Sequence, residues 1–156
     1  MHIYFDLDET VIDEEGDEVR PGVRSLFEKL LIDGHQLSLW SASTEERGTE
    51  LLAQHGLSGI FRNTVFREDY DPNREGYGKD IRYRCGDLLV DDSPAQVEFV
   101  QSLGKKGLLV PSFRTELKKH WIDDSLDIYN QITCMSEESQ SSFSQSKKCP
   151  QSRGLR

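Results

Sequence analysis

The chain begins with M-H-I-Y-F-D-L-D-E-T-V-I-D, residues 1–13, and this stretch decides which fold the rest of the sequence can adopt. Ile3–Phe5 is a short apolar run that predicts a buried β-strand. It ends in Asp6 and Asp8, whose side chains point the same way on an extended strand because side chains alternate along it. Two such carboxylates are costly to bury unless a cation lies beside them, and oxygen ligands suit Mg²⁺. A solvated acidic turn is the alternative that this stretch leaves open.

Length and composition describe one acidic domain. The chain has 156 residues, of which 35% are hydrophobic and 30% are charged, and its net charge is −9. We therefore expect no general attraction to nucleic acid or to membranes, although a nucleic-acid end is not excluded as a substrate. No apolar run approaches the roughly 18 residues of a membrane helix, and no signal-peptide pattern opens the chain. The three cysteines lack C-x-x-C spacing, which predicts a cytoplasmic location and leaves a nuclear one open.

Apolar strands and amphipathic helices alternate along the chain. Helices are expected over about residues 22–33, from the capping residue Thr44 to Gly56, and over about 94–102. Further strands are expected at residues 36–40, 64–66, 87–90 and 108–110. This alternation predicts an α/β, Rossmann-like fold with three layers, in which helices cover both faces of a parallel sheet of about five strands.

The C-terminal part of the sequence is expected to add one helix and a tail. Residues 1–132 should form a single domain, with its core over 1–111 and a helix over about 114–132. The apolar residues that suggest this helix are Leu117, Trp121, Leu126 and Tyr129. Residues 136–156 are rich in Ser, Gln, Lys and Glu, which predicts a disordered tail.

Polar residues follow three of the expected strands. Asp6 and Asp8 follow the first strand, Ser41 follows the second, and Asp91 and Asp92 follow the fourth. The carboxyl ends of parallel strands meet at one edge of the sheet, which is where α/β proteins of this kind bind their ligands. The sequence therefore predicts a functional site at this edge.

These residues can together support the Mg²⁺-dependent hydrolysis of a phosphate monoester. The Asp6 carboxylate can attack phosphorus to form an aspartyl-phosphate, and Asp8 can protonate the leaving group and then activate water. The Asp91–Asp92 pair can hold Mg²⁺ together with Asp6. The hydroxyl of Ser41 can bind a phosphoryl oxygen, and Lys79 can neutralise the remaining charge. A solvated loop lysine is the alternative for Lys79, in which case a nearby arginine would supply the charge.

Four segments resemble the ordered motifs of the haloacid dehalogenase (HAD) phosphatase superfamily. They are F-D-L-D-E-T, L-W-S-A-S, the lysine in Y-G-K-D, and L-L-V-D-D-S-P, within about residues 3–111. Through R-P-G-V, W-S-A-S and F-R-E the chain looks most like the carboxy-terminal-domain phosphatase (NIF-type) branch. The resemblance implies Asp6 as the nucleophile, Asp8 as the acid and base, and Ser41, Ala42 and Lys79 as phosphate-binding residues.

The resemblance also implies a magnesium site and an open architecture. Mg²⁺ would be bound by Asp6, by Asp8 through its backbone carbonyl, and by Asp91, with Asp92 nearby. The chain departs from the NIF-type branch in a shorter segment before R-P-G-V and in Asp92, where that branch often has Asn. The short spacings leave no room for a large cap domain. By resemblance, uncapped members tend to act on large substrates, so a phosphoprotein or similar macromolecule is expected.

Three other functions compete with a phosphomonoester hydrolase. One is a non-catalytic HAD-fold protein that binds a phosphate group or a partner. Another is a phosphotransferase that acts on a small metabolite or nucleotide, which the same residues would support. The last is a phosphorylatable receiver domain, which the order of motifs disfavours, because the third expected strand has no aspartate until Asp69.

Overall fold

The computed structural model of the protein describes residues 1–141 and is organised around a single β-sheet. The five strands of this sheet are parallel and lie in the order β3-β2-β1-β4-β5. The strands are β1 (His2–Phe5), β2 (Gln36–Trp40), β3 (Thr64–Val65), β4 (Leu88–Asp91) and β5 (Lys106–Leu109). The expected α/β, Rossmann-like fold with a five-stranded parallel sheet is therefore confirmed.

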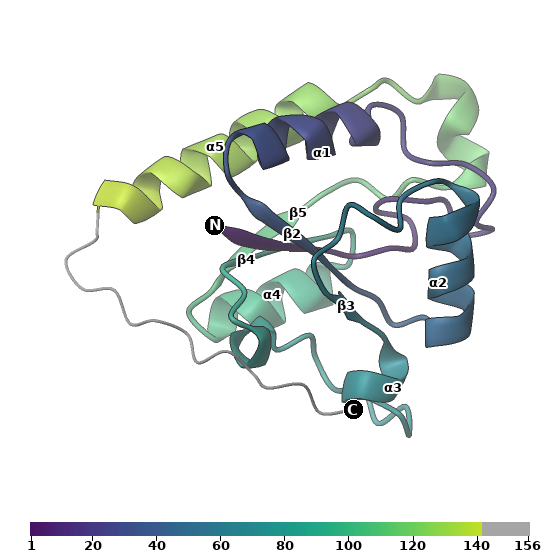
Figure 1. Cartoon of the computed structure of the whole chain (residues 1–156), viewed down its shortest axis with the longest axis horizontal. Helices are drawn as coiled ribbons and strands as arrows, with labels where there is room; N and C mark the ends of the chain where they lie inside the picture. Colours follow the sequence, from purple (N-terminus) through teal and green to yellow (C-terminus); the bar gives the residue numbers. More distant parts are fainter. Residues whose placement is uncertain (142–156) are drawn as a thin grey trace.

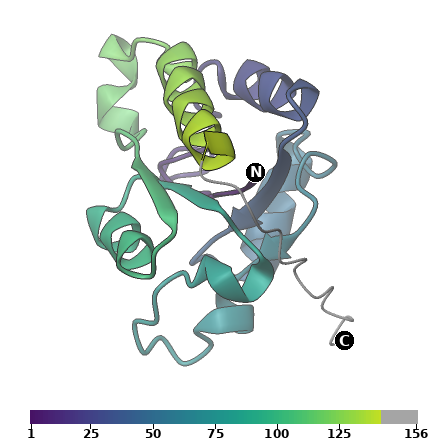
Figure 2. The same ribbon diagram turned by 90° about the vertical axis from the view of Figure 1, so that its left-hand side faces the viewer.

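Helices cover both faces of the sheet, as the two ribbon views show (Figures 1 and 2). α1 (Val23–Ile32) and α5 (Ser125–Ser141) lie against one face, and α4 (Pro94–Ser102) lies against the other. α2 (Glu45–Gln54) begins after Thr44, whose hydroxyl accepts a hydrogen bond from the Arg47 N–H at 3.3 Å. The shorter helices are α3 (Arg67–Tyr70) and the 3₁₀ helices η1 (Ile81–Arg84) and η2 (Thr115–His120).

The core lies on both sides of β1, because alternate side chains of a strand point to opposite faces. Ile3 and Phe5 belong to the larger apolar cluster, which includes residues of α1 and α5. Tyr4 belongs to a smaller cluster with Trp40 and Leu89 on the face that α4 covers. A central strand that is buried on both faces explains why its sequence is uniformly apolar. It also fixes where the chain emerges with Asp6.

The C-terminal helix differs from the expectation of a helix over residues 114–132. The chain forms η2, runs without helical structure through residues 121–124, and only then enters α5. Asp124, the last residue of this segment, accepts two hydrogen bonds of 3.0 and 2.6 Å from Arg20.

One face of α5 packs on the larger apolar cluster. Its buried residues are Ile128 and Ile132, with Met135 packed against the same cluster, whereas Leu126, which suggested the helix in the sequence, is 58% exposed. This spacing of four and three residues keeps one apolar stripe on the core. Residues 136–141, expected in the tail, extend α5 beyond this stripe. The rest of the predicted tail, residues 142–156, lies outside the described residues.

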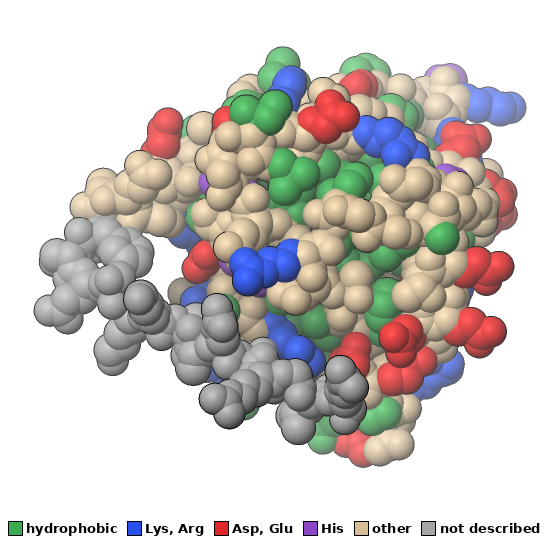
Figure 3. Space-filling model, in the orientation of Figure 1, with side chains coloured by type: hydrophobic (Ala, Val, Ile, Leu, Met, Phe, Trp, Pro, Cys, Tyr) green, Lys and Arg blue, Asp and Glu red, His purple; other side chains and the backbone are tan. Residues whose placement is uncertain are grey.

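Acidic side chains mark the right-hand side of the space-filling view (Figure 3), the side on which Figure 1 shows α2 and α3. These helices carry Glu45, Glu46, Glu50, Glu68 and Asp69. Within residues 1–141, no helix is both long enough and apolar enough to cross a membrane.

Candidate active site

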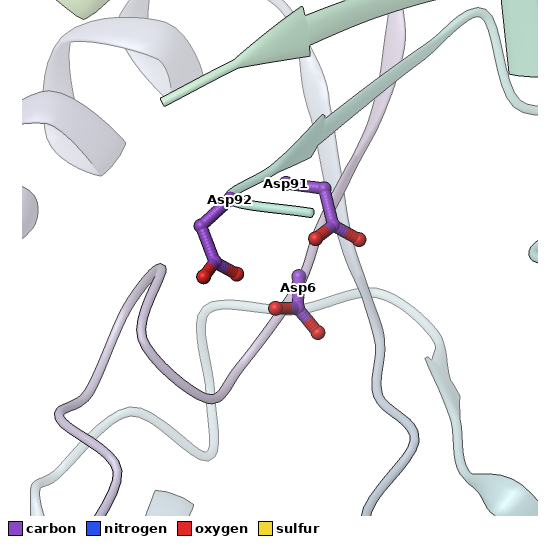
Figure 4. Close-up of side chains that lie close together, drawn as sticks. All are labelled: Asp6, Asp91 and Asp92. Atoms are coloured by element: carbon purple, nitrogen blue, oxygen red, sulfur yellow. The ribbon is translucent and has the colours of Figure 1, made fainter. Parts of the chain in front are cut away.

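Three aspartates converge at the carboxyl edge of the sheet (Figure 4). Asp6 follows β1 directly, Asp91 is the last residue of β4, and Asp92 comes next. One carboxylate oxygen from each of the three lies within 4.8 Å of the others. Asp6 is 7% exposed and Asp91 is 1% exposed, so their charges have little contact with water. Three of the four predicted metal ligands, Asp6, Asp91 and Asp92, thus come together, and three hard oxygen donors of this kind could hold Mg²⁺.

Lys79 lies directly against two of these carboxylates. Its Nζ is 2.7 Å from Oδ1 of Asp6 and 2.8 Å from Oδ2 of Asp91, and the residue is 3% exposed. The alternative of a solvated loop lysine is therefore wrong. Arg82, one of the arginines that could have replaced it, is bound instead to Asp80 at 2.7 Å. The motif lysine is thus the cation that accompanies the candidate nucleophile.

The carboxyl group of Asp6 has an unusual protonation equilibrium. Burial raises its pKa to about 7, against the opposing effect of the Lys79 ammonium and with a further increase from the nearby negative charge of Asp91. Burial by itself would lower the pKa of Lys79, but the carboxylates of Asp6 and Asp91 outweigh it and raise that pKa. The single positive charge of Lys79 therefore does not fully offset the negative charge of these carboxylates. A further cation would favour the ionised form of Asp6.

Two hydroxyl groups complete the surroundings of the carboxylates, and the sequence analysis missed both. Oγ1 of Thr10 lies 3.2 Å from Oδ2 of Asp6 and 3.2 Å from Oδ1 of Asp92, and it accepts the Asp92 N–H at 3.2 Å. The hydroxyl of Ser112 donates to Oδ2 of Asp92 at 2.5 Å. Thr10 could have been found from its place in F-D-L-D-E-T, but Ser112 has no local signal because only the fold brings it to Asp92.

The side chain of Asp8 lies apart from the three carboxylates. Its Oδ1 is 2.8 Å and its Oδ2 3.1 Å from Nη1 of Arg47, in the first turn of α2. The side chains of Asp8 and Arg47 are 35% and 40% exposed, so the pair lies where a substrate can reach it. The structure thus does not bring the Asp8 side chain into the predicted metal cluster, and a contribution from its backbone carbonyl stays a prediction. Arg47 is a site residue that the sequence analysis missed.

The predicted phosphate-binding turn after β2 is folded around Ser41. Oγ of Ser41 accepts the N–H of Ser43 at 3.0 Å, and the Ser41 side chain is fully buried. Ala42 is exposed. The hydroxyl of Ser43 accepts a hydrogen bond from Nη1 of Arg47 at 3.1 Å, so Ser43 is the serine that contacts the Asp8–Arg47 pair. The Ser41 hydroxyl keeps its own hydrogen for donation, and its role on phosphate stays a prediction.

Arg20, from R-P-G-V, holds together the loops that carry the site. Its Nη1 donates to the carbonyl of Thr10 at 3.2 Å and to the carbonyl of Pro111 at 2.9 Å. Its other nitrogens bind Asp124, and its guanidinium lies 4.9 Å from the centre of the Trp121 ring. The residue is 3% exposed. Arg20 therefore links the loop after β1 to the segment after β5, next to Ser112.

Comparison with known proteins supports the fold. No protein-family model matches the chain, and no curated protein matches its sequence. Among solved structures, the chain is similar to one described as a beta-phosphoglucomutase from Thermotoga maritima, with a TM-score of 0.54 and 18% sequence identity. The match covers 73% of this chain and 61% of that one. This likeness shows a Rossmann-like α/β fold.

Proposed function

We propose that the protein is a Mg²⁺-dependent phosphomonoester hydrolase that acts through an aspartyl-phosphate on Asp6. The observation that carries this proposal is the position of Lys79 Nζ, 2.7 Å from Asp6, which lies together with Asp91 and Asp92. A carboxylate nucleophile and an anionic phosphate repel each other unless positive charge lies between them. Bound Mg²⁺ would supply positive charge against the phosphoryl oxygens, with Asp6, Asp91 and Asp92 as its carboxylate ligands.

The proposed hydrolysis has two steps, in which Asp6 and Asp8 have different roles. In the first step, a carboxylate oxygen of Asp6 forms a bond to phosphorus while the ester P–O bond breaks, and Asp8 gives its proton to the departing oxygen. In the second step, Asp8 takes a proton from water, the water oxygen bonds to phosphorus, and the bond to Asp6 breaks, which releases inorganic phosphate. The separation of Asp8 from the carboxylate cluster supports this division of roles.

Phosphoryl transfer to an acceptor other than water is the second candidate. The name of the structural neighbour, a beta-phosphoglucomutase, denotes movement of a phosphoryl group, and the residues around Asp6 would serve such a transfer equally well. Hydrolysis is favoured by the accessible position of Asp8, because water reaches a carboxylate that is 35% exposed without the help of a second domain. The NIF-type branch and a macromolecular substrate remain expectations from the resemblance.

The proposal is tested by the hydrolysis of para-nitrophenyl phosphate with Mg²⁺ and with EDTA. We expect turnover that requires Mg²⁺ in the wild type and is lost in Asp6→Asn. Asp127→Asn is the control, because Asp127 is exposed on α5 and its carboxylate binds Gln131. Metal-independent turnover, or full activity of Asp6→Asn, would contradict the proposal. Adding alcohols to the assay separates the two candidates, since a phosphotransferase would form new phosphate esters.

A further inference from the structure

A cavity of about 840 Å³ adjoins the candidate active site on the face of the sheet that α4 covers. Its lining residues come from β2, β3, α3, α4 and the segment 76–84. Five aromatic residues line it: Trp40, Tyr70, Tyr77, Tyr83 and Phe99. Aromatic rings are the side chains that favour flat apolar ligands, because they offer large faces for stacking.

The cavity and the catalytic residues share the same backbone segments. Lys79, whose ammonium touches Asp6, lies between the lining residues Gly78 and Asp80. The N–H of Lys79 donates to Oε1 of the lining residue Gln96 at 3.0 Å, on the helix that follows Asp91 and Asp92. Lys79 thus links the two places: its backbone contacts the cavity lining, and its ammonium contacts Asp6 and Asp91.

Tyr70 provides an independent link between the cavity and the site. Its pKa is raised by burial, and the charges of Lys79 and Asp6 also act on its phenol group. The ring packs edge-on against Trp40, with 5.4 Å between ring centres. Tyr70 is one of the five aromatic residues of the lining, called the aromatic wall below, and it is therefore close enough to Asp6 for that charge to act on it.

The wall combines a tightly packed interior with an exposed rim. A Cβ on Gly78 would lie 2.3 Å from Cδ1 of Phe99, so only glycine lets the backbone approach this ring so closely. Tyr77 is 58% exposed and Tyr83 is 80% exposed. Large rings exposed at the mouth of a cavity are typical of binding surfaces.

We propose that this cavity binds the base of a nucleoside monophosphate whose phosphate group lies at Asp6 and Lys79. This inference rests on the proposed function and names its substrate class. The base stacks on the aromatic wall, and the sugar spans the distance that the Lys79 side chain spans in the protein. A ring bonded directly to the phosphate, as in phosphotyrosine, would stay near the carboxylates and leave the cavity unfilled.

Polar groups in the wall favour a base over a plain hydrocarbon ring. Gln96 and Arg84 bring N–H donors to the lining, and Asp69 and Asp80 bring carboxylate acceptors. The edge of a base offers both donors and acceptors. The net charge of −9 favours a mononucleotide over a nucleic-acid chain.

Binding can be measured without catalysis, because the sequence contains only two tryptophans, Trp40 and Trp121. In Trp121→Phe, Trp40 reports on the cavity alone, and circular dichroism checks that this variant is folded. With Mg²⁺ present and Asp6→Asn added to block turnover, adenosine and uridine monophosphates should quench Trp40 fluorescence, after correction for nucleotide absorption. Ribose 5-phosphate and phosphotyrosine should not. Quenching by phosphotyrosine at equal or lower concentration would overturn the proposal.

Two variants change the cavity from its exposed side. Tyr83→Ser removes a stacking ring. Ala95→Leu puts a larger side chain into the lining and so reduces the space for a ligand. In the Trp121→Phe background each should raise the Kd for the mononucleotide by roughly fivefold or more. Ile122→Ser is the matched control, because Ile122 is 85% exposed and lies outside the cavity lining. An unchanged Kd in both cavity variants, or an equal change in the control, would overturn the proposal.

Failure of this inference can be distinguished from failure of the proposed function. Mononucleotide binding at the cavity without turnover of any phosphate ester would support the base site and contradict the hydrolase. Turnover of para-nitrophenyl phosphate that is lost in Asp6→Asn, with no mononucleotide binding or competition, would support the hydrolase and overturn the base site.

Discussion

Arg47 and Asp8 form an ion pair, 2.8 Å from Nη1 to Oδ1, separate from the contacts of Lys79 with Asp6 and Asp91. Both oxygens of Asp8 face the same guanidinium nitrogen. A carboxyl group that is to donate a proton to a leaving group must turn one oxygen toward it. We therefore expect the pair to open when the substrate binds, with Ser43 and the phosphate as other partners for Arg47.

Asp8→Asn is expected to slow hydrolysis by about 10²–10⁴-fold, the usual contribution of a general acid or base. The loss of kcat should be larger for alkyl phosphates than for para-nitrophenyl phosphate, because a poor leaving group depends more on protonation. Rates for a series of esters with different leaving groups measure this directly. An equal loss across the series would contradict the role of Asp8 as the acid.

Arg47→Met serves as the comparison for this role. Arg47 donates no proton in the proposed steps, so its loss should affect kcat less than the loss of Asp8 does, and it should not steepen the dependence on the leaving group. If Arg47→Met and Asp8→Asn gave the same leaving-group dependence, the ion pair would have to act as one unit.

Lys79→Met is expected to increase the response of protein stability to Mg²⁺. Without the ammonium, Asp6, Asp91 and Asp92 are three nearby carboxylates that share no cation, so a metal ion gains more by binding there. Thermal unfolding in EDTA and over a Mg²⁺ titration should show a lower Tm without metal and a larger upward shift with it. Asp91→Asn combined with Asp92→Asn should abolish the shift. A Mg²⁺ response that these substitutions leave unchanged would place the metal elsewhere.

Most of the fold follows from patterns that are local in the sequence. Ile3–Phe5 predicts the central strand, and Thr44 predicts the start of α2, because each pattern reflects the geometry of its own element. The start of the C-terminal helix was misplaced, and the residue before it, Asp124, is bound by Arg20, 104 residues away. No helical periodicity contains that information.

The candidate site also contains residues that local sequence patterns predict and residues that they do not. Asp6, Asp91 and Lys79 were predicted from strand ends and motifs, and the fold brings them into contact. Ser112 could not be predicted, since its hydrogen bond to Asp92 depends on the path of the chain after β5. The aromatic cavity was also missed, because its lining comes from five separate segments. Local patterns thus identify chemical groups, and the fold determines which of them meet.

Arg20→Met is expected to destabilise the protein by about 2–4 kcal/mol. The Arg20 side chain is 2% exposed, so its loss leaves Asp124 without its partner, although the 21% exposure of Asp124 reduces the cost. This corresponds to a Tm lower by roughly 5–15 °C for a domain of this size. Urea or thermal unfolding measures the change. A shift no larger than that of the exposed control Ile122→Ser would show that the two loops hold together without Arg20.

Asp13 is expected to make stability fall at acidic pH. Burial tends to raise its pKa, but hydrogen bonds from Lys118 and from the backbone N–H groups of Asp17 and Glu18 outweigh burial and lower the pKa below its ordinary value of 3.8. A lowered pKa means that the stabilisation is present above pH 3.8 and is lost as the pH falls through the folded-state pKa.

Asp13→Asn should therefore be less stable than the wild type at neutral pH, and the difference should shrink as the pH falls through this range. Unfolding midpoints measured between neutral pH and the acidic limit of folding test this expectation. Parallel curves for the two proteins would contradict it.

The central claim is that Asp6 itself becomes phosphorylated, and it can be tested by trapping the intermediate. The protein is mixed with Mg²⁺ and para-nitrophenyl phosphate, whose good leaving group makes the first step depend little on Asp8. The mixture is quenched in acid and treated with borohydride, which reduces an aspartyl-phosphate to homoserine. Mass spectrometry of the N-terminal peptide should find homoserine at position 6 in the wild type, more of it in Asp8→Asn because the second step is slowed, and none in Asp6→Asn. Phosphate release without any modification at Asp6, or homoserine at another aspartate, would contradict the account.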